Sequence, residues 1–335
     1  MTPAPDPGLS LELRSVTKKY PSKKPSLFSR TSTYINAVND VTLSVPSGGT
    51  LGLVGESGSG KSTLARLILR LEDVTSGDIL FSGTSILNAT GPDLKRFRQQ
   101  VQMVFQDPFG SLNPRMSVGE LISEAWIVHP EKRPQNPDAR LAELMAQVGL
   151  RPEWRSRYPG QFSGGQRQRI GIARALAVGP ELLVCDEAVS ALDVSVQAQI
   201  LKLLKDIQRD IGITYIFISH DLSVVRYISD HVAVMYLGSI VESGPAQRVY
   251  DNPAHPYTQA LLAAVPTFQD GKGSDRRPEL QGEPPDPANP PSGCPFRTRC
   301  WRAQARCANE KPLLVAHEED RLTACHFPEL RQPAA

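Results

Sequence analysis

A short glycine- and serine-rich segment is the first candidate for chemistry in this chain. Residues 55–62, GESGSGKS, fit the pattern G-x-x-x-x-G-K-[ST], in which successive backbone N–H groups form a cradle for phosphate. The apolar run GTLGLVG leads into it and the helical pattern KSTLARLILRL follows, so a helix start adds positive potential to the cradle. Lys61 would reach the outer phosphates, and Ser62 would offer its hydroxyl to Mg²⁺. The alternative, a Gly/Ser turn with a helix cap, leaves this agreement of strand, loop and helix unexplained.

Two adjacent carboxylates close a second apolar run. The segment LLVC, residues 182–185, ends in Asp186 and Glu187. We expect Asp186 to hold the metal through water, and Glu187 to act as the base that polarises the attacking water. The alternative is a solvated strand end, which does not call for two acids directly after an apolar run. Cys185, inside this strand, is predicted to be a small buried hydrophobe.

A second candidate anion site begins at Ser163. Ser163 and Gln166, three residues apart, form a capping box, which predicts a helix start. Gly164 and Gly165 follow in the first turn, although glycine is about 1 kcal/mol less favourable than alanine inside a helix. Bare backbone at a positive helix end suits the close approach of an anion, whereas a merely poor helix start is the alternative. The chain thus has two candidate phosphate-binding sites but only one lysine-bearing loop. Either it binds two nucleotides, or the second site contacts a nucleotide that another copy of the domain binds.

The elements around these motifs predict an α/β fold. The segments LSLELRSVTKKY and YINAVNDVTLSV alternate apolar and polar residues, as half-buried strands do, and a polar, basic loop joins them. The runs ELLVCDEA and ITYIFISHD are predicted buried strands, and a helical pattern at 195–212 separates them. Strand–helix–strand alternation implies a parallel sheet. From about residue 92 to 178 the pattern is mostly helical and is interrupted by proline, which predicts an inserted helical subdomain.

Composition restricts the partners and the compartment. The chain has 335 residues, of which 37 are basic and 35 acidic, and this balance argues against nucleic acid as the main partner. Its apolar runs are far shorter than the roughly 18–20 residues of a membrane-spanning helix. The start MTPAPDPGLS lacks the basic residues and apolar stretch of a secretory signal, so we expect a soluble cytosolic chain. In a reducing compartment, clustered cysteines are metal ligands or redox thiols more often than disulfides.

Four of the five cysteines gather in the tail, after a linker at about 266–292 that is rich in Gly, Pro and charge. Their spacing, C-x₅-C-x₆-C-x₁₇-C, lacks the paired C-x₂-C knuckles of zinc sites. Four thiolates could still bind either a [4Fe–4S] cluster or Zn²⁺. Neighbouring aromatic side chains could shield the metal site from water, and one histidine could replace a cysteine as a ligand. The alternative is that the thiols are small buried side chains that bind no metal. The cysteines are Cys294, Cys300, Cys307 and Cys325, the aromatic residues are Phe296, Trp301 and Phe327, and the histidine is His326.

The order of these motifs resembles that of ATP-binding cassette (ABC) ATPases. SGGQ at 163–166 lies about a hundred residues after the phosphate loop and just before LLVCDE, as the signature motif of that family does. The resemblance implies that Tyr20 stacks on adenine, that Gln106 in VFQDP senses the γ-phosphate, and that His220 contacts the γ-phosphate. It also implies a head-to-tail dimer, in which the signature of one chain closes on ATP held by the other. The loop that would cross the dimer interface is Ser190, Ala191, Leu192 and Asp193.

A finer resemblance points to one branch of the family. The segments DPFGSLNPRMSVGE, SALDVSVQAQIL, DNPAHPYTQALLAAVP and the cysteine-bearing tail resemble the ATPase subunits of oligopeptide and dipeptide importers. One departure is Phe162, where the family more often has Leu before the signature serine; because Phe is also apolar, we expect activity to be retained. The resemblance implies a peripheral place on the cytoplasmic face of the bacterial inner membrane. It also tilts the tail prediction toward a structural [4Fe–4S] cluster, with zinc as the second choice.

The implied partners are those of an importer. Two membrane permease subunits would dock near Gln106 and residues 107–120, and an extracytoplasmic binding protein would deliver the peptide. The second ATPase subunit is usually a separately encoded paralogue in this branch. Glutathione and nickel importers share these ATPase features, so the cargo stays open. Two other classes of function are alternatives to an importer subunit. The first is a soluble ABC ATPase, but one of DNA repair would need a long coiled-coil insertion, and one of translation would carry two cassettes. The second is a non-enzymatic metal-binding regulator built around the tail.

The resulting prediction is an α/β P-loop NTPase of the ABC type, with a β-subdomain, an inserted helical subdomain and a small Cys-rich tail domain. We place the nucleotide-binding domain at 8–265, its helical subdomain at about 107–178, and the tail region at 266–335. The expected catalytic residues are Glu187 and His220. The expected Mg²⁺ residues are Ser62, Gln106 and Asp186. The expected ATP-binding residues are Tyr20, Gly55, Glu56, Ser57, Gly58, Ser59, Gly60, Lys61, Ser62, Thr63 and Gln106, with the signature Ser163, Gly164, Gly165 and Gln166 acting on the partner's ATP.

Overall fold

A computed structural model describes residues 8–21, 34–107, 110–264, 280, 282–318 and 320–329. The chain divides into two compact parts, and each is described by itself. The first part comprises Met1–Leu11, Ser44–Thr50 and Leu80–Ser219, and the second part comprises Glu12–Leu43, Leu51–Ile79 and His220–Ala335. Residues 22–33 of the predicted basic loop and 265–279, which include the predicted domain boundary and most of the predicted linker, lie outside the described residues.

Three parallel strands form the centre of the first part, in the order β8-β7-β6. Val184 of the middle strand is in register with Met103 on one side and Ile216 on the other. Every residue of the middle strand is buried, as its unbroken apolar sequence predicts for a strand covered on both faces. A helix joins β7 to β8, which confirms the predicted strand–helix–strand unit. The bounds are Val101–Val104 for β6, Leu182–Asp186 for β7, Thr214–Ser219 for β8 and Val194–Ile211 for the helix α6.

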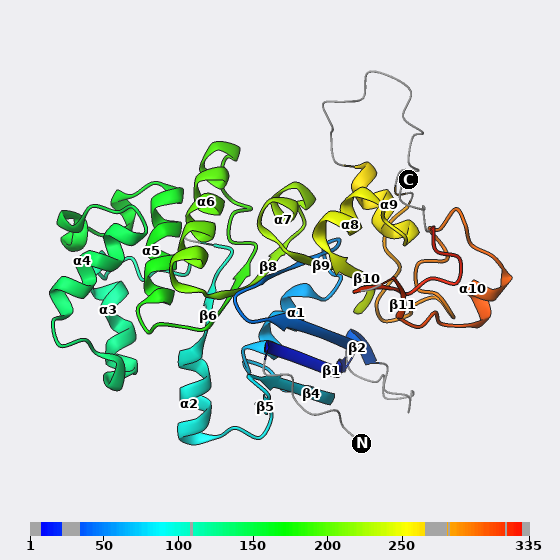
Figure 1. The fold of residues 1–335 in the computed structure, drawn as a ribbon, viewed down its shortest axis with the longest axis horizontal. Helices are drawn as coiled ribbons and strands as arrows, with labels where there is room; N and C mark the ends of the chain where they lie inside the picture. The colour runs from blue at the N-terminus through cyan, green and yellow to red at the C-terminus, as the bar shows by residue number, and fades with distance from the viewer. Residues whose placement is uncertain are drawn as a thin grey trace, which may run out of the picture. The chain divides into compact units, whose positions relative to one another are not determined.

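Helices α3 (Val118–Val128), α4 (Pro137–Gln147) and α5 (Gly164–Leu176) pack against one another in the first part (Figure 1). The Trp126 indole N–H donates to the carbonyl of Ala177 at 2.9 Å and so ties α3 to the end of α5. The sequence predicts a mostly helical pattern from about residue 92, but the strand β6 interrupts it. The four residues of β6 are too few to show the alternation of a strand. The other elements are β5 (Thr84–Ser85), α2 (Gly91–Gln100) and the 3₁₀ helices Pro130–Lys132, Pro152–Ser156 and Pro159–Gln161.

Five paired strands lie in the second part, and β3 leads into the phosphate loop. β3 pairs in parallel with β9, and β10 pairs antiparallel with both β9 and β12, while β11 pairs antiparallel with β12. β3 is wholly buried, as the run GTLGLVG predicts. These strands span Thr50–Val54 (β3), His231–Tyr236 (β9), Ser239–Pro245 (β10), Val315–Glu318 (β11) and Arg321–Thr323 (β12).

Three further strands, most of whose residues lie in the second part, and five helices complete its described elements. The strands β2, β1 and β4 are neighbours in that order. β1 and β2 cover the two segments that the alternating pattern predicts as half-buried strands. The bounds are β1 (Leu9–Pro21), β2 (Tyr34–Pro46), β4 (Ser76–Phe81), α1 (Lys61–Ile68), α7 (Leu222–Ile228), α8 (Ala246–Asp251), α9 (Pro256–Ala263) and α10 (Ala305–Asn309). Within the described residues, no helix combines the length and apolar character needed to cross a membrane.

A buried ion pair attaches β12 to β10. The carboxylate of Glu242 accepts hydrogen bonds from Arg321 Nη2 at 3.0 Å and from the N–H groups of Ala254 and His255 at 2.9 Å each. The side chains of Glu242 and Arg321 are 0% and 1% exposed. Removing one member of such a pair leaves the other as an uncompensated buried charge, which is costly.

Replacing Arg321 by Ala is therefore expected to lower the free energy of unfolding by about 3–5 kcal/mol. Urea unfolding of the full chain measures this change. The matched control is Arg306→Ala, because Arg306 pairs with Glu310 on the exposed surface and such pairs contribute at most about 1 kcal/mol. Equal stability of the two variants would contradict a structural role for the buried pair.

Candidate functional site

The phosphate loop of the second part depends on glycine at two positions. Gly55 has φ +155° and Gly60 has φ +107°, both in the region that side chains disfavour. A Cβ atom at Gly55 would lie 2.2 Å from the carbonyl oxygen of Met235, and one at Gly60 would lie 2.2 Å from that of Ala37. The neighbouring strands therefore approach the loop so closely that only glycine fits. Helix α1 begins at Lys61 directly after the loop, as predicted.

Lys61 holds the loop together from inside. Its side chain is 5% exposed, and its Nζ donates to the carbonyls of Gly55 and Glu56 at 2.7 and 2.9 Å. The hydroxyl of Ser59 lies 3.4 Å from the same Nζ. The ammonium group thus occupies the concave side of the loop, where its charge would face a bound phosphate.

Tyr20, expected to stack on adenine, ends β1 in the same part. Its hydroxyl is hydrogen-bonded to Glu72, and the ammonium of Lys18 lies 5.0 Å from the centre of its ring. Burial and the Glu72 carboxylate both raise the pKa of the Tyr20 hydroxyl, while the hydroxyl of Thr63 lowers it. Tyr20 is therefore fixed beside the first turn of α1, near one of the predicted phosphate residues.

The acidic pair of the first part lies at the end of β7. Asp186 is 9% exposed, and Glu187 leaves the strand with a positive φ of 47°. The Glu187 N–H donates to the carbonyl of Ile218 at 2.9 Å. Gln106 Nε2 donates to the Glu187 carboxylate at 2.7 Å, a contact that sequence reasoning did not anticipate. Two residues chosen separately from the sequence are therefore brought together, and the Gln106 amide oxygen is left to accept other donors or a cation.

The predicted capping box is present at the start of α5. The Ser163 hydroxyl accepts from the Gln166 N–H at 3.4 Å, and Gln166 Oε1 accepts from the Ser163 N–H at 3.0 Å. Phe162 before it is buried and packs edge-on against Trp154, as expected for an apolar substitute of Leu. A helix therefore begins where the sequence predicts it.

The two signature glycines have a packing role that the sequence did not reveal. A Cβ at Gly165 would lie 2.3 Å from Val196 Cγ1 on α6, and one at Gly164 would lie 3.3 Å from Leu192 Cδ2. Gly165 is therefore required for close contact between two helices, in addition to the proposed approach of an anion. The signature start and the 190–193 loop consequently lie side by side within the first part.

The 190–193 loop is held in a fixed turn. Asp193 caps α6 by accepting from the Val196 N–H at 2.9 Å and from the Ser195 hydroxyl at 2.7 Å. These hydrogen bonds lower the pKa of the Asp193 carboxyl, and the one from Ser195 has the largest effect. The Ser190 hydroxyl donates to the carbonyl of Glu187 at 3.0 Å, which joins the loop to the proposed base. His220, which follows β8, is exposed.

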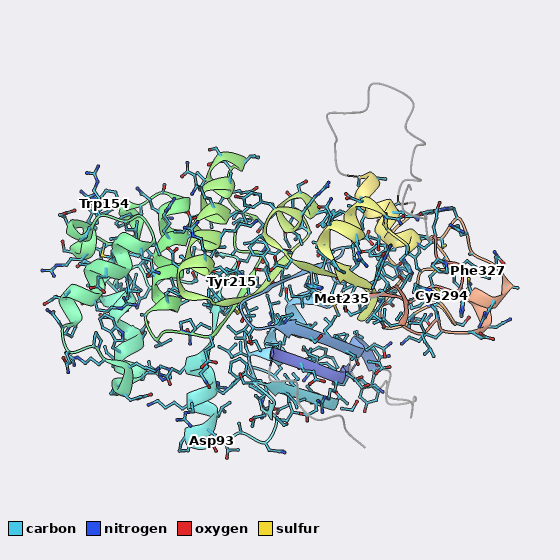
Figure 2. All side chains as sticks on the ribbon, in the orientation of Figure 1. Asp93, Trp154, Tyr215, Met235, Cys294 and Phe327 are labelled. Atoms are coloured by element: carbon cyan, nitrogen blue, oxygen red, sulfur yellow. The ribbon has the colours of Figure 1, made fainter. Side chains whose placement is uncertain are left out.

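The four tail cysteines line one cavity in the second part, together with Phe296, Phe327 and His326. All are free thiols, and the backbone N–H of Cys294 donates to the carbonyl of Cys307 at 2.8 Å. Cys294 and Phe327 are labelled in this region in Figure 2. Trp301, expected to shield the cysteines, is 41% exposed and does not line the cavity, so that prediction is wrong.

Burial makes these thiols weak acids. It raises the pKa of Cys294 and of Cys325 to about 11 each, and it raises that of Cys300. Nearby His255 is neutral, because burial lowers its pKa to about 3. Among the described residues, no three or more His, Cys, Asp or Glu side chains are placed to hold a metal ion, so the metal predictions gain no support here. Cys185, by contrast, is fully buried in β7 as predicted, and burial raises its pKa to about 12.

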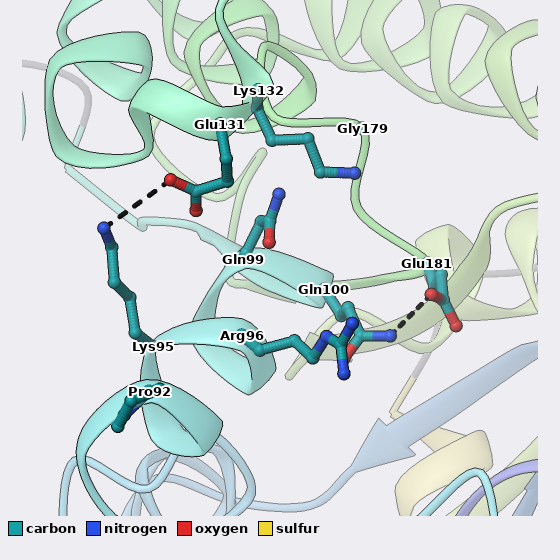
Figure 3. Close-up of a pocket in the computed structure, with 9 residues that line it drawn as sticks. All are labelled: Pro92, Lys95, Arg96, Gln99, Gln100, Glu131, Lys132, Gly179 and Glu181. Carbon is teal, nitrogen blue, oxygen red and sulfur yellow. Dashed lines mark hydrogen bonds and ion pairs between the residues drawn. The ribbon is translucent and has the colours of Figure 1, made fainter.

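A polar hollow in the first part contains none of the predicted site residues. It is lined by residues of α2, of the 3₁₀ helix after α3 and of the segment before β7. Lys95 pairs with Glu131 at 3.6 Å, and Gln100 Nε2 donates to Glu181 at 2.7 Å (Figure 3). Its acidic groups are therefore already engaged by neighbours, and the predicted nucleotide chemistry lies elsewhere.

Comparison with protein families gives two matches. Residues 38–190 match the family described as ABC transporter, and residues 241–307 match the family described as Oligopeptide/dipeptide transporter, C-terminal region. The first match contains the phosphate loop, the signature and the acidic pair. The second contains three of the four tail cysteines.

Individual relatives match over nearly their whole length. The oligopeptide transport ATP-binding protein AppF of Bacillus subtilis is 50% identical over 95% of this chain and 97% of its own. The dipeptide transport ATP-binding protein DppF of Haemophilus influenzae is 44% identical over 92% of this chain and 94% of its own. Among solved structures, the dimeric ATP-binding cassette MJ0796 bound to ADP and Pi has a TM-score of 0.61 at 26% identity, covering 70% of this chain and 98% of that one.

The packing role of Gly165 makes a distinct prediction. Gly165→Ala should lower the free energy of unfolding by about 1–3 kcal/mol, because its Cβ clashes with Val196, even though Ala favours the helix. The double variant Gly165→Ala/Val196→Ala should recover most of that loss, with Val196→Ala alone as the control. Urea unfolding checks the series, and a Gly165→Ala variant as stable as the wild type would rule the packing role out.

Proposed function

Because this chain belongs to the family of ABC transporter ATP-binding subunits, we propose that it hydrolyses ATP to power the import of peptides through a membrane transporter. The ATPase activity follows from the family itself. The peptide cargo is supported by one observation above all, the match of residues 241–307 to a C-terminal region found in oligopeptide and dipeptide transporters. Relatives named for both cargoes match this chain over more than nine-tenths of its length.

Each part of the chain has a proposed share in the reaction. In the second part, backbone N–H groups of residues 55–63 other than that of Glu56, which donates to Tyr257, would bind the phosphates, and Lys61 would turn from its two loop carbonyls toward them. Tyr20 would stack on adenine and His220 would contact the γ-phosphate. In the first part, Glu187 would orient and polarise the attacking water, with Gln106 holding its carboxylate.

The donor set suits Mg²⁺. Ser62, Gln106 and Asp186 offer a hydroxyl, an amide oxygen and a carboxylate, which are the hard oxygen ligands that this ion prefers. Since Gln106 Nε2 is used by Glu187, its oxygen is the end left for a cation. When bound, the ion would neutralise charge that develops on the phosphate oxygens.

The proposed working unit is a dimer. Ser163, Gly164, Gly165 and Gln166 would act on ATP held by a second ATPase subunit, and the 190–193 loop would meet that subunit. A paralogue is the proposed second subunit. ATP would then join the two chains, and loss of the γ-phosphate would release them, which makes the dimer a ligand-biased two-state element.

The proposed location is the cytoplasmic face of the bacterial inner membrane, reached through two permease subunits. Residues 107–120, of which 108–109 lie outside the described residues, are the proposed docking segment together with Gln106. An extracytoplasmic binding protein would supply the peptide. Glutathione and nickel remain the alternative cargoes, since importers of both resemble peptide importers in these ATPase features.

The proposed base gives a direct test. Glu187→Gln should lower the ATPase rate by about 10²–10⁴-fold, because the amide cannot accept the proton, while ATP binding is kept. Steady-state hydrolysis and equilibrium binding of ATP measure the two effects. Glu181→Gln is the matched control, since Glu181 precedes the same strand at its opposite end and is exposed. Unchanged hydrolysis in Glu187→Gln would reject the assignment.

We also propose a [4Fe–4S] cluster as the occupant of the cysteine cavity, with Zn²⁺ as the second choice. Four cysteines around one cavity support it, and the flanking rings of Phe296 and Phe327 would keep water away. The preference for a cluster over zinc comes from the resemblance of the cysteine-bearing tail to that of peptide-importer ATPases.

Anaerobic purification of the full chain tests the cluster. Absorption spectroscopy with iron, sulfide and zinc analysis should find about four irons per chain, falling in Cys300→Ser. Cys185→Ala is the matched control, because Cys185 is buried in β7 and does not line the cavity. If the chain contains stoichiometric zinc instead, the cluster proposal is wrong and the cavity holds a structural zinc ion. If it contains no metal, both metal proposals are wrong and the thiols are buried packing groups.

A further inference from the structure

The phosphate loop is clamped by the cysteine-bearing segment of the same chain. Arg299, the residue before Cys300, donates two hydrogen bonds to the carboxylate of Glu56, from Nη1 at 2.7 Å and from Nη2 at 3.0 Å. The two residues are 243 positions apart in the sequence, and both lie in the second part. The Arg299 side chain is only 4% exposed and that of Glu56 is 25% exposed. A bidentate pair so well shielded fixes orientation as well as charge.

Glu56 is held at three points by three different groups. Its carboxylate is held by Arg299, its N–H donates to the Tyr257 hydroxyl at 2.9 Å, and its carbonyl accepts from Lys61 Nζ at 2.9 Å. Glu56 is the second residue of the phosphate loop. Its side chain and both of its backbone polar groups are thus held together, and the Glu56 carbonyl is one of the two acceptors that fix Lys61 Nζ.

The anchor of this clamp is an aromatic cluster. Phe296, three residues before Arg299, is 1% exposed, and its ring packs against Tyr236 at 5.3 Å and Tyr257 at 5.4 Å between centroids. The Arg299 guanidinium lies 5.9 Å from the centre of the Tyr236 ring. Aromatic contacts of this kind have a defined geometry, so the cluster sets the position from which Arg299 reaches the loop.

We infer that Arg299 is a positioning residue for ATP, through which the segment 294–300 sets the conformation of the phosphate loop. The cysteine-bearing region then has a role at the nucleotide that does not depend on what occupies its cavity. The inference rests on the proposal that residues 55–63 bind the phosphates of ATP. It predicts that ATP affinity depends on an arginine that acts through Glu56.

The inference is tested by calorimetry, which measures how tightly the full chain binds a non-hydrolysable ATP analogue in the presence of Mg²⁺. Arg299→Ala should raise the dissociation constant about tenfold to a hundredfold, because a hydrogen bond to a charged group contributes a factor of about that size. Arg299→Lys should recover part of the loss, since it keeps the charge but not the bidentate geometry. Arg302→Ala is the matched control and should bind as the wild type does, because Arg302 pairs with Glu329 instead.

A double-variant cycle separates positioning from general damage to the fold. If Arg299 acts through Glu56, then Arg299→Ala/Glu56→Gln should bind no more weakly than the weaker single variant. Additive losses, or wild-type affinity in Arg299→Ala, would overturn the inference. Failure of the wild-type chain to bind the analogue would instead overturn the proposed phosphate site, so the two failures are distinguishable. Steady-state kinetics of the assembled transporter should show the same split, with KM for ATP raised in Arg299→Ala more than kcat is lowered.

Discussion

Hydrogen-bond demand at the 55–62 loop is the constraint on which the rest of the structure depends. A loop that binds phosphate must keep most of its N–H groups for the ligand, so its carbonyls need donors from side chains and neighbouring strands. Lys61 supplies them to Gly55 and Glu56, and the N–H of Gly238 donates to the carbonyl of Ser59 at 2.9 Å. The strands carrying Met235 and Ala37 approach closely enough that a side chain at Gly55 or Gly60 has no room. The cradle is thus a consequence of packing around the loop as much as of its own sequence.

Local pattern was enough to predict the elements that carry the site. The buried strands β3, β7 and β8, the helix that starts at Lys61 and the capping box of Ser163 all depend on residues that lie close together in the sequence, and all were predicted. β6 was hidden, because four residues show no period and lie directly after a helix. The short strand β12 pairs with β10, which is distant in the sequence, and β11 pairs with β12 in turn. No local pattern predicts the pairing of β12 with β10.

Contacts between distant residues explain what the sequence could not provide. Gln106 and Glu187 were each assigned a role, but their hydrogen bond joins residues 81 positions apart. Gly165 was interpreted from the chemistry of helix starts, whereas its neighbour Val196 belongs to the next helix. The sequence places four cysteines in the tail, but only the fold shows that they share a cavity that Trp301 does not line. The hydrogen bond from Arg299 to the phosphate loop is likewise visible only in the fold.

The conformation of Glu187 shows how one residue can separate the proposed roles of two neighbouring acids. In a continuing strand, the side chains of Asp186 and Glu187 would point to opposite faces of the sheet. The positive φ of Glu187 breaks that alternation, at a cost of about 1–3 kcal/mol for a residue other than glycine. Its N–H bond to Ile218 and its carboxylate bond to Gln106 hold the turn in place. Asp186 therefore stays in the buried environment of the strand, which suits a metal-binding carboxylate, while Glu187 turns to a partner that can fix the direction of a base. Glycine would adopt the same turn without strain but would lose the carboxylate, so the strain is accepted where the chemistry requires a side chain.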